Sequence, residues 1–250
     1  MNSIEREIFN MYNKEKIGSE TENKYCRHCK DKYKNLAGPI SFFHVGSNFA
    51  NDKYKIIFVG KNSWYDKQSY EKERLPEKSF ADATETGRRS LLGGNDNSMY
   101  WDYIRDIIGK LYSNINEKEK IKNIAITNII KCNTTGEKGI ADDKTPKSIV
   151  KNCIASRIFE KEIEIIKPKR IIFLTGNKYD EYIKTFNFGC VGCNSVDLSD
   201  NEINGKILNW RRKLYDNDTL KYSILRTSHP QGKNKVTFIR NIMNWIKYPA

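Results

Sequence analysis

The sequence predicts an α/β fold, a three-layer sandwich in which helices cover both faces of a central four-stranded parallel sheet. Apolar runs of strand length recur along the chain, amphipathic helical segments lie between them, and each run ends in a polar or glycine-containing stretch. Continuous apolar runs are typical of strands buried on both faces, and helical crossovers join parallel strands. Ligands bind beyond the carboxyl ends of such strands, so we expect the functional residues there.

The length and composition indicate one domain spanning residues 1–250, because no stretch resembles a linker, a repeat or a low-complexity tract. Within it we distinguish a cysteine-bearing N-terminal segment, 1–50, and an insertion, 187–218. No apolar run approaches the roughly 18 residues that span a bilayer, and the N-terminus lacks a signal-peptide core. We therefore expect a cytoplasmic protein without a membrane contact.

The elements of the first half begin with a helix, because Ile4, Ile8 and Tyr12 have helical spacing. Segment 36–51 has no clean period and is expected to be irregular, and segment 66–97 is expected to be a long loop with broken helical turns. Ser98 is a candidate N-cap for the next helix. The expected regular elements are helix 3–15, strand 55–60, the helix from Ser98 to Leu111 and strand 123–130.

In the second half, Thr145 and Pro146 suit the start of a helix that runs to about Lys167, where Pro168 stops it. Segment 187–218 is the least regular part, although the basic cluster 209–213 suits a hairpin. The other expected elements are strand 170–176, a short helix 177–186, strand 222–227 and a final helix 234–247, which is expected to pack Val236 and Ile239 onto the sheet.

The formal net charge is +13 and the pI is near 9.3, a large excess of positive charge for one domain. Such an excess suits a polyanionic partner such as DNA or RNA. A chain that is simply rich in lysine, asparagine and isoleucine would have the same balance, so charge alone leaves the partner open.

The six cysteines form two C-x-x-C pairs, Cys26 with Cys29 and Cys190 with Cys193, and two single residues, Cys132 and Cys153. Disulfides rarely persist in the cytosol, so metal ligation or simple burial is expected instead. Two C-x-x-C pairs also have the spacing of a structural zinc site.

Four predicted strand ends carry polar residues that the sheet should bring together. Each of these residue types also occurs in ordinary turns, so no single end indicates chemistry. The four ends are Gly60-Lys61-Asn62-Ser63-Trp64, Asn128, Thr175-Gly176-Asn177 and His229-Pro230.

Taken together, these motifs resemble the uracil-DNA glycosylase superfamily, most closely its iron–sulfur branch and the branches whose first motif is G-x-N. The first motif corresponds to Gly60-Lys61-Asn62, and the second, an H-P-S type motif, to His229-Pro230-Gln231-Gly232. An I-T-N-x-x-K-C run of the iron–sulfur branch matches 126–132, and a following pattern that ends in a strand and glycine matches 162–176. The resemblance covers roughly 25–240.

The chain departs from the iron–sulfur branch at Asn62, where an acidic or small residue is typical, and at Ser63-Trp64, which replace P-G. Gln231 replaces the usual serine, and the stretch between Cys132 and Cys153 is longer. These differences affect the expected identity of the excised base more than the expected fold.

The resemblance implies that Asn62 and His229 are the catalytic residues. Cleavage of an N-glycosidic bond develops positive charge on the sugar and negative charge on the departing base. Asn62 would orient the attacking water through its amide oxygen, and His229 would donate a hydrogen bond to the base oxygen. A structural role for a single histidine at a strand end is the alternative.

The expected substrate-binding residues are Gly60, Lys61, Ser63, Trp64, Phe80 and Asn128. The amide of Asn128 could pair with either uracil or a cytosine, depending on its orientation, or it could simply form a turn. An extruded base needs an aromatic stacking platform, for which Phe80, Trp64 and Tyr65 are candidates that could equally belong to the core. Gln231, Lys233 and Lys235 are expected to contact DNA near the flipped nucleotide, and Arg88, Arg89, Arg211 and Arg212 would extend the basic face.

The resemblance also implies a 4Fe-4S cluster on Cys26, Cys29, Cys132 and Cys153, with Cys190 and Cys193 unligated. A structural zinc is the alternative. The expected function is that of a monomeric, monofunctional DNA glycosylase that flips uracil or another modified pyrimidine from single- or double-stranded DNA and leaves an abasic site. A glycosylase for a bulky or phage-type modified cytosine, acting in antiviral defence rather than base excision repair, and a catalytically inactive DNA-binding member are the alternatives.

Overall fold

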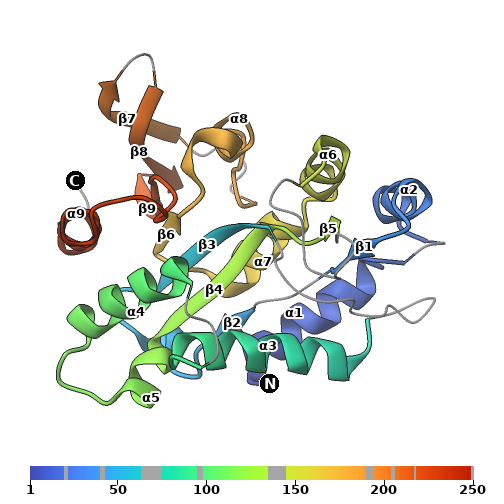
Figure 1. The fold of residues 1–250 in the computed structure, drawn as a ribbon, viewed down its shortest axis with the longest axis horizontal. Coiled ribbons are helices and arrows are strands. Elements are labelled where there is room, and N and C mark those ends of the chain that lie inside the picture. Colours follow the sequence, from blue (N-terminus) through green and yellow to red (C-terminus); the bar gives the residue numbers. More distant parts are fainter. Residues whose placement is uncertain are drawn as a thin grey trace. The chain divides into compact units, whose positions relative to one another are not determined.

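The computed structural model in Figure 1 describes residues 1–19, 22–39, 43–62, 75–94, 98–134, 145–189, 194–203, 206–216 and 218–248. The chain divides into two compact units, which are described separately below. The first unit contains Met1–His44, Lys61–Gly87 and Thr127–Ile166, and the second contains Val45–Gly60, Arg88–Ile126 and Lys167–Ala250. The expected single domain spanning 1–250 stays a prediction.

In the described part of the chain, the main sheet has seven strands in the order β2-β4-β3-β6-β9-β8-β7. The four strands expected from the sequence are neighbours in this sheet, in the order β4-β3-β6-β9. A smaller sheet pairs β1 with β5. The strands are β1 Leu36–Ala37, β2 His44–Val45, β3 Ile56–Asn62, β4 Ile124–Ile130, β5 Asn133–Thr134, β6 Arg170–Phe173, β7 Asn194–Ile203, β8 Lys206–Asp216 and β9 Thr219–Arg226.

The parallel pairings explain why these strands are apolar. Ile57 lies opposite Ile171 in the β3–β6 pair, and Ile171 lies opposite Ile224 in the β6–β9 pair. All three side chains are completely buried. A fully buried isoleucine contributes about 1.5–3 kcal/mol, so a strand of such residues strongly favours the interior of the sheet. The predicted α/β fold with a central, mostly parallel sheet is confirmed, although the sheet has seven strands rather than four and β7 and β8 pair antiparallel.

In the first unit, α1 (Ser3–Lys14) begins with a capping box in which Asn2 and Glu5 exchange side-chain-to-backbone hydrogen bonds. The cysteine-bearing segment also forms a helix, α2 (Lys24–Lys32), capped by Asn23. Helix α2 packs against α6 (Lys147–Ala155), and α1 packs against α7 (Ile158–Ile166).

The expected loop with broken turns over 66–97 is wrong where the structure describes it, because α3 (Glu77–Leu91) is one continuous helix. The glycine that suggested a break has another role. A Cβ at Gly87 would lie 2.7 Å from the carbonyl oxygen of Phe43, so the helix can pass this backbone only with glycine there.

The single helix expected from Pro146 to Lys167 is instead two helices, α6 and α7. They are separated at Arg157, whose φ of 56° lies in the left-handed region. No glycine or proline marks this break, so the apolar pattern continued across it. Pro146 is the N-cap of α6 rather than its first residue.

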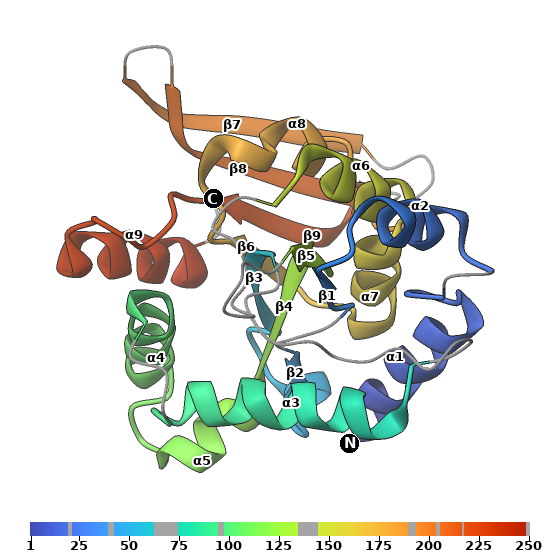
Figure 2. The same ribbon diagram turned by 45° about the vertical axis from the view of Figure 1, so that its right-hand side comes forward.

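In the second unit, α4 (Met99–Leu111) and α9 (Lys235–Lys247) pack side by side (Figure 2). Ile239 is buried in this packing, but Val236 is 75% exposed and does not pack onto the sheet as expected. This unit also has two short helices, α5 (Glu117–Lys120) and α8 (Asp180–Ile183), and 3₁₀ turns at Phe49–Asn51, Ile121–Asn123 and Gly176–Tyr179.

The expected irregular insertion at 187–218 forms a long antiparallel hairpin of β7 and β8, which extends the parallel strands through β9 (Figure 1). The basic cluster 209–213 lies within β8, so the expectation of a hairpin is confirmed. Cys190 and Cys193 lie outside the described residues. Within the segments that the structure describes, no helix has both the length and the apolarity to cross a bilayer.

Candidate active site

In the second unit, the loop after β6 lies against the loop after β9. The N–H of Thr227 donates to the carbonyl of Phe173, and the N–H of Gly176 donates to the carbonyl of Thr227. Gly176 adopts a φ of 66°, and its backbone approaches the N–H of His229. Leu174 also donates to Val59 in β3, so the ends of β3, β6 and β9 meet as the sequence predicted.

His229 is held in one orientation by its neighbours. The N–H of Gln231 donates to Nδ1 of His229 at 3.3 Å, which makes Nδ1 the acceptor of the ring. In a neutral imidazole the other nitrogen, Nε2, then carries the proton and is the donor. The side chain of His229 is half-buried.

One face of α4 holds the loop that carries His229. Tyr100 stacks on the imidazole of His229, and Tyr103 donates its hydroxyl hydrogen to the carbonyl of Lys233 at 2.6 Å. Asp106 forms an ion pair with Lys235 at 2.8 Å. Residues 100, 103 and 106 are spaced by three and therefore lie on one side of the helix. The segment from His229 to the start of α9 is thus held at three successive points.

The Tyr100 hydroxyl is buried and has no hydrogen-bond partner among the described residues. Burial raises the pKa of Tyr100 well above its ordinary value, so the hydroxyl stays protonated. A buried polar group without a partner is costly. Tyr100 is therefore placed by its ring and not by its hydroxyl.

Arg226, the last residue of β9, anchors the strand that leads to His229. Its side chain is only 1% exposed and forms an ion pair with Asp180 of α8 at 2.7 Å, with the guanidinium 6.0 Å from the ring centre of Trp210. Burial lowers the pKa of Arg226 and raises that of Asp180, which the attraction of Arg226 partly offsets. A buried pair of this kind fixes the strand end, because removing either partner leaves an unpaired charge.

The first motif leaves β3 within the first unit. Gly60 is buried and belongs to the second unit, Lys61 is half-buried, and Asn62 is the last residue of β3. The side chain of Asn62 and all of Ser63 and Trp64 lie outside the described part of the chain. The expected catalytic pairing of Asn62 with His229 stays a prediction.

Asn128 differs from every other residue of β4. The rest of the strand is buried, whereas Asn128 is partly exposed. Its side-chain amide makes no hydrogen bond to any described residue, although its backbone carbonyl does. A free amide at the partly exposed position of a buried strand has both its donors and its acceptor available for a ligand.

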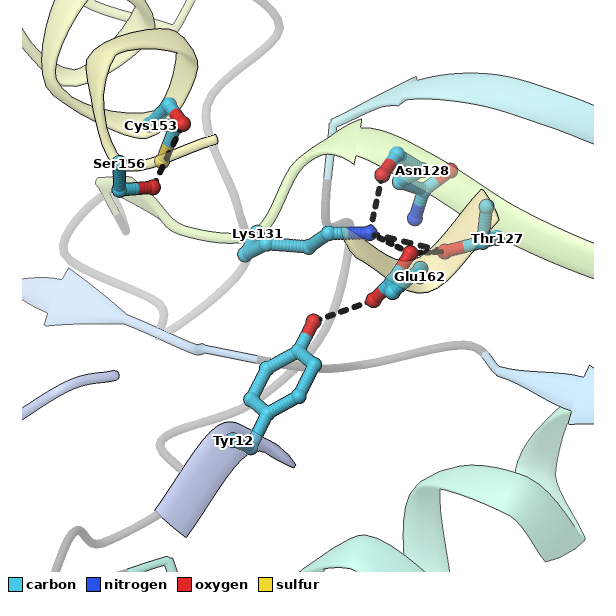
Figure 3. A network of polar contacts seen from close by, with 7 residues as sticks. All are labelled: Tyr12, Thr127, Asn128, Lys131, Cys153, Ser156 and Glu162. Atoms are coloured by element: carbon cyan, nitrogen blue, oxygen red, sulfur yellow. Dashed lines mark hydrogen bonds and ion pairs between the residues drawn. The ribbon is translucent and has the colours of Figure 1, made fainter. Parts of the chain in front are cut away.

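Next to Asn128 lies a buried polar network, shown in Figure 3. Lys131 extends back from the end of β4, and its Nζ donates to Oε2 of Glu162 at 2.6 Å, to Oγ1 of Thr127 at 2.8 Å and to the carbonyl of Asn128 at 2.5 Å. Tyr12 donates its hydroxyl hydrogen to Oε1 of Glu162 at 2.5 Å. Burial lowers the pKa of Lys131, which the carboxylate of Glu162 partly offsets, and burial raises that of Tyr12.

Four cysteines lie within electrostatic range of one another in the first unit, and all four are free thiols: Cys26 and Cys29 in α2, Cys132 just after β4, and Cys153 in α6. Burial raises the pKa of Cys26 to about 12. The hydrogen bond between Cys132 and Cys153 lowers the pKa of Cys153 to about 7 and raises that of Cys132.

Hydrogen-bond donors point at three of these sulfurs. The N–H of Gly18 donates to Cys26 at 3.0 Å, and the side-chain amide of Asn152 donates to Cys29 at 3.2 Å. The backbone N–H groups of Lys131 and Cys132 donate to Cys153. Such donors stabilise thiolates and are typical of iron–sulfur ligands, so the donor set fits a cluster. Across the described residues, no three His, Cys, Asp or Glu side chains are grouped to hold a metal ion.

The other residues predicted to bind the substrate or DNA have different environments. Phe80 is completely buried and packs against the rings of Phe9, Tyr12 and Phe43, which indicates a core role rather than a stacking platform. Gln231 and Lys233 are exposed, whereas the ammonium of Lys235 is paired with Asp106.

Of the other basic residues, Arg212 pairs with Asp197 of the hairpin. Arg89 is exposed on α3, and Arg88 and Arg211 are half-buried.

The sequence analysis did not assign roles to Tyr100, Tyr103, Lys131 or Glu162. Lys131 and Glu162 could have been noticed as charged residues inside mostly apolar segments. The two tyrosines gave no such signal, because aromatic residues on an amphipathic helix usually belong to the core.

A comparison with protein-family models finds one match, to the uracil DNA glycosylase superfamily, over residues 48–247. The chain belongs to this superfamily. Superfamily membership supports a DNA glycosylase-type hydrolase that acts in DNA repair and binds DNA. No individual curated protein matches the chain.

The superfamily match includes both glycosylase motifs, Asn128, Cys132 and Cys153. Cys26 and Cys29 precede it. The match therefore shows the superfamily but tests neither the roles of these residues nor a cluster that needs the first cysteine pair.

Proposed function

We propose that this superfamily member is a monofunctional DNA glycosylase that flips uracil or another modified pyrimidine out of DNA and hydrolyses its N-glycosidic bond. The observation that carries the proposal is the hydrogen bond from the Gln231 N–H to Nδ1 of His229. It leaves Nε2 as a donor, and a donor is what the departing base needs where negative charge accumulates.

The roles of the residues follow from the charges in the reaction. As the bond from the sugar to N1 of the base breaks, the electron pair stays on the base and spreads to its O2 oxygen. His229 donates a hydrogen bond to that oxygen. Asn62 orients a water molecule toward the cationic sugar carbon through its amide oxygen. The water loses its proton to solvent, and the product is an abasic site.

Asn128 recognises the base edge in this proposal. Its amide presents an acceptor and two donors, so one orientation matches the N3–H and O4 of uracil, and the other matches N3 and the amine of a cytosine. The free amide at the one partly exposed position of β4 supports this role. Extrusion of the base costs a few kcal/mol, which contacts of Gln231 and Lys233 with the DNA help to offset.

The four thiols are proposed to hold a 4Fe-4S cluster. Each thiolate of such a cluster binds a different iron, so its ligands lie farther apart than those of one zinc ion. Four free thiols in one compact unit, with hydrogen-bond donors at the sulfurs of Cys26 and Cys29, support this proposal. When bound, it would tie α2 and α6 to the end of β4, and it takes no part in the hydrolysis.

Incubation with single-stranded and duplex oligonucleotides that contain uracil, hypoxanthine, thymine mismatches or modified cytosines tests the proposal. Alkaline treatment then cleaves DNA at abasic sites. Cleavage at uracil supports a role in base excision repair, and cleavage only at modified cytosines supports a role in antiviral defence. Binding without cleavage on any substrate would indicate an inactive DNA-binding member. The proposal includes a monomeric state and a cytoplasmic location, which gel filtration and cell fractionation test.

A further inference from the structure

The network around Lys131 satisfies every polar group that it buries. Lys131 is 4% exposed and Glu162 is completely buried, yet the three N–H donors of Lys131 have three acceptors. The hydroxyl of Thr127 also donates to Oε2 of Glu162 at 2.8 Å. Tyr12 donates to the other oxygen, Oε1, so both carboxylate oxygens of Glu162 accept hydrogen bonds.

A buried ion pair adds little net stability at such a position. Apolar residues of similar size in place of a buried pair are often neutral or stabilising, whereas loss of one partner is strongly destabilising. Stability alone therefore does not explain why this chain has Lys131 and Glu162 here. A network with all partners present does fix geometry, because each member restrains the others.

The geometry that this network fixes is that of Asn128. Nζ of Lys131 holds the carbonyl of Asn128, and Lys131 is held by Glu162, which Tyr12 of α1 restrains in turn. As Figure 3 shows, the contacts come from β4, α1 and α7. The backbone of Asn128 is thereby attached to two helices, while its side-chain amide is left free.

We propose that Lys131 and Glu162 are positioning residues that set the orientation of Asn128 and thereby the recognition of the target base. This inference rests on the proposed function, because it assigns base recognition to Asn128. Lys131 does not contact the substrate, since it is buried beneath the strand. Lys131 affects catalysis by holding the backbone carbonyl of Asn128.

The test uses Lys131→Met, Glu162→Met, the double variant and Asn128→Ala. Unfolding temperature and excision kinetics are measured for each, together with the preference for uracil over other bases. We expect both single variants to be strongly destabilised and the double variant to regain most of that loss, with a remainder from the Tyr12 hydroxyl, which loses its acceptor. The double variant should nevertheless keep about a tenfold loss in kcat/KM, mostly through a raised KM, and a weaker base preference.

A second arm separates positioning from a general structural effect. If Lys131 and Glu162 act only through Asn128, the variant that combines their double substitution with Asn128→Ala has the same kcat/KM as Asn128→Ala alone. The side chain whose orientation they set is absent from both variants. Thr127→Val removes the hydroxyl that joins Lys131 to Glu162 and keeps both charges, so it gives the same comparison if the double variant does not fold. Tyr12→Phe removes the bond that restrains Glu162, and Tyr112→Phe is its matched control, since it removes a similar tyrosine–carboxylate bond, to Asp52 in the second unit.

Wild-type kinetics and base preference in the stable double variant would overturn the inference and leave the proposed function intact. Independent, multiplying losses from the double substitution and Asn128→Ala would also overturn it. A wild-type protein that excises no base would overturn the proposed function and this inference together.

Discussion

The imidazole of His229 and the ring of Tyr100 lie nearly parallel, with ring centroids 6.1 Å apart and an interplanar angle of 23°. One face of the imidazole is thereby covered, while the Gln231 N–H occupies Nδ1. Two neighbours thus define the position of the ring and the identity of its donor nitrogen. This arrangement leads to the first prediction.

Replacement of Tyr100 separates its ring from its hydroxyl. Tyr100→Phe keeps the stacking and removes a buried hydroxyl that has no partner in the described part of the chain, so we expect stability to rise by up to about 1 kcal/mol. Tyr100→Ala removes the ring and should lower kcat by about tenfold through a less ordered His229. Urea denaturation and single-turnover excision measure the two effects. Equal kcat values for Tyr100→Ala and the wild type would show that the stacking has no role.

His229→Ala should lower the rate of base excision by about 100-fold, since a well-placed donor to a developing oxyanion contributes about that much. The unfolding temperature should change little, because His229 is only half-buried. Single-turnover rates at saturating enzyme isolate the chemical step. A loss of DNA binding with an unchanged chemical step would assign His229 to binding instead.

Asn62→Asp should raise the rate of uracil excision by about tenfold, because a carboxylate activates water more strongly than an amide. Asn62→Ala should lower the rate. The measurement is the initial rate of abasic-site formation across neutral pH. A lower rate for the aspartate variant than for the alanine variant would contradict a water-orienting role for Asn62.

The proposed cluster on the four thiols leads to a prediction about the absorption spectrum of the protein. The purified protein should be brown and absorb at about 400 nm, as expected for a 4Fe-4S cluster. Serine at Cys26, Cys29, Cys132 or Cys153 should abolish this absorption. Serine at Cys190 or Cys193 is the matched control and should leave it unchanged. A colourless protein whose bound zinc depends on Cys190 and Cys193 would support the zinc alternative.

The buried pair Arg226–Asp180 and the exposed pair Lys235–Asp106 should differ in energy. Asp180→Asn weakens the partner of an arginine that is 1% exposed, so we expect a loss of about 3 kcal/mol in unfolding free energy. Asp106→Asn affects a pair that is 41% and 46% exposed and should cost less than about 1 kcal/mol. Chemical denaturation compares them, and similar losses would show that Arg226 does not depend on Asp180.

The sequence predicted those parts of the fold that depend on residues close together in the chain. Ile57 and Ile171 lie in apolar runs that have no other stable location than the middle of a sheet, and both are found there. Gly87 gave the wrong signal, since glycine is both a helix breaker and the residue that permits close backbone approach. Only the position of Phe43, far away in the sequence, distinguishes the two.

The candidate site was predictable to a similar extent. His229 was identified because it follows an apolar run. Asn128 was identified as a polar residue at a strand end, but it lies inside β4, before the buried Ile129 and Ile130. Tyr100 and Glu162 were not assigned roles, since their functions depend on contacts with residues 129 and 31 positions away. The break at Arg157 was missed because its left-handed conformation leaves no trace in the apolar pattern.

Mass spectrometry of the reaction products tests the central claim most directly. The account predicts that the purified protein releases a free pyrimidine base from DNA and leaves an intact strand with a hydrated abasic sugar, and that His229→Ala slows this release. Recovery of unchanged DNA for every base tested, under conditions in which the protein binds DNA, would contradict it.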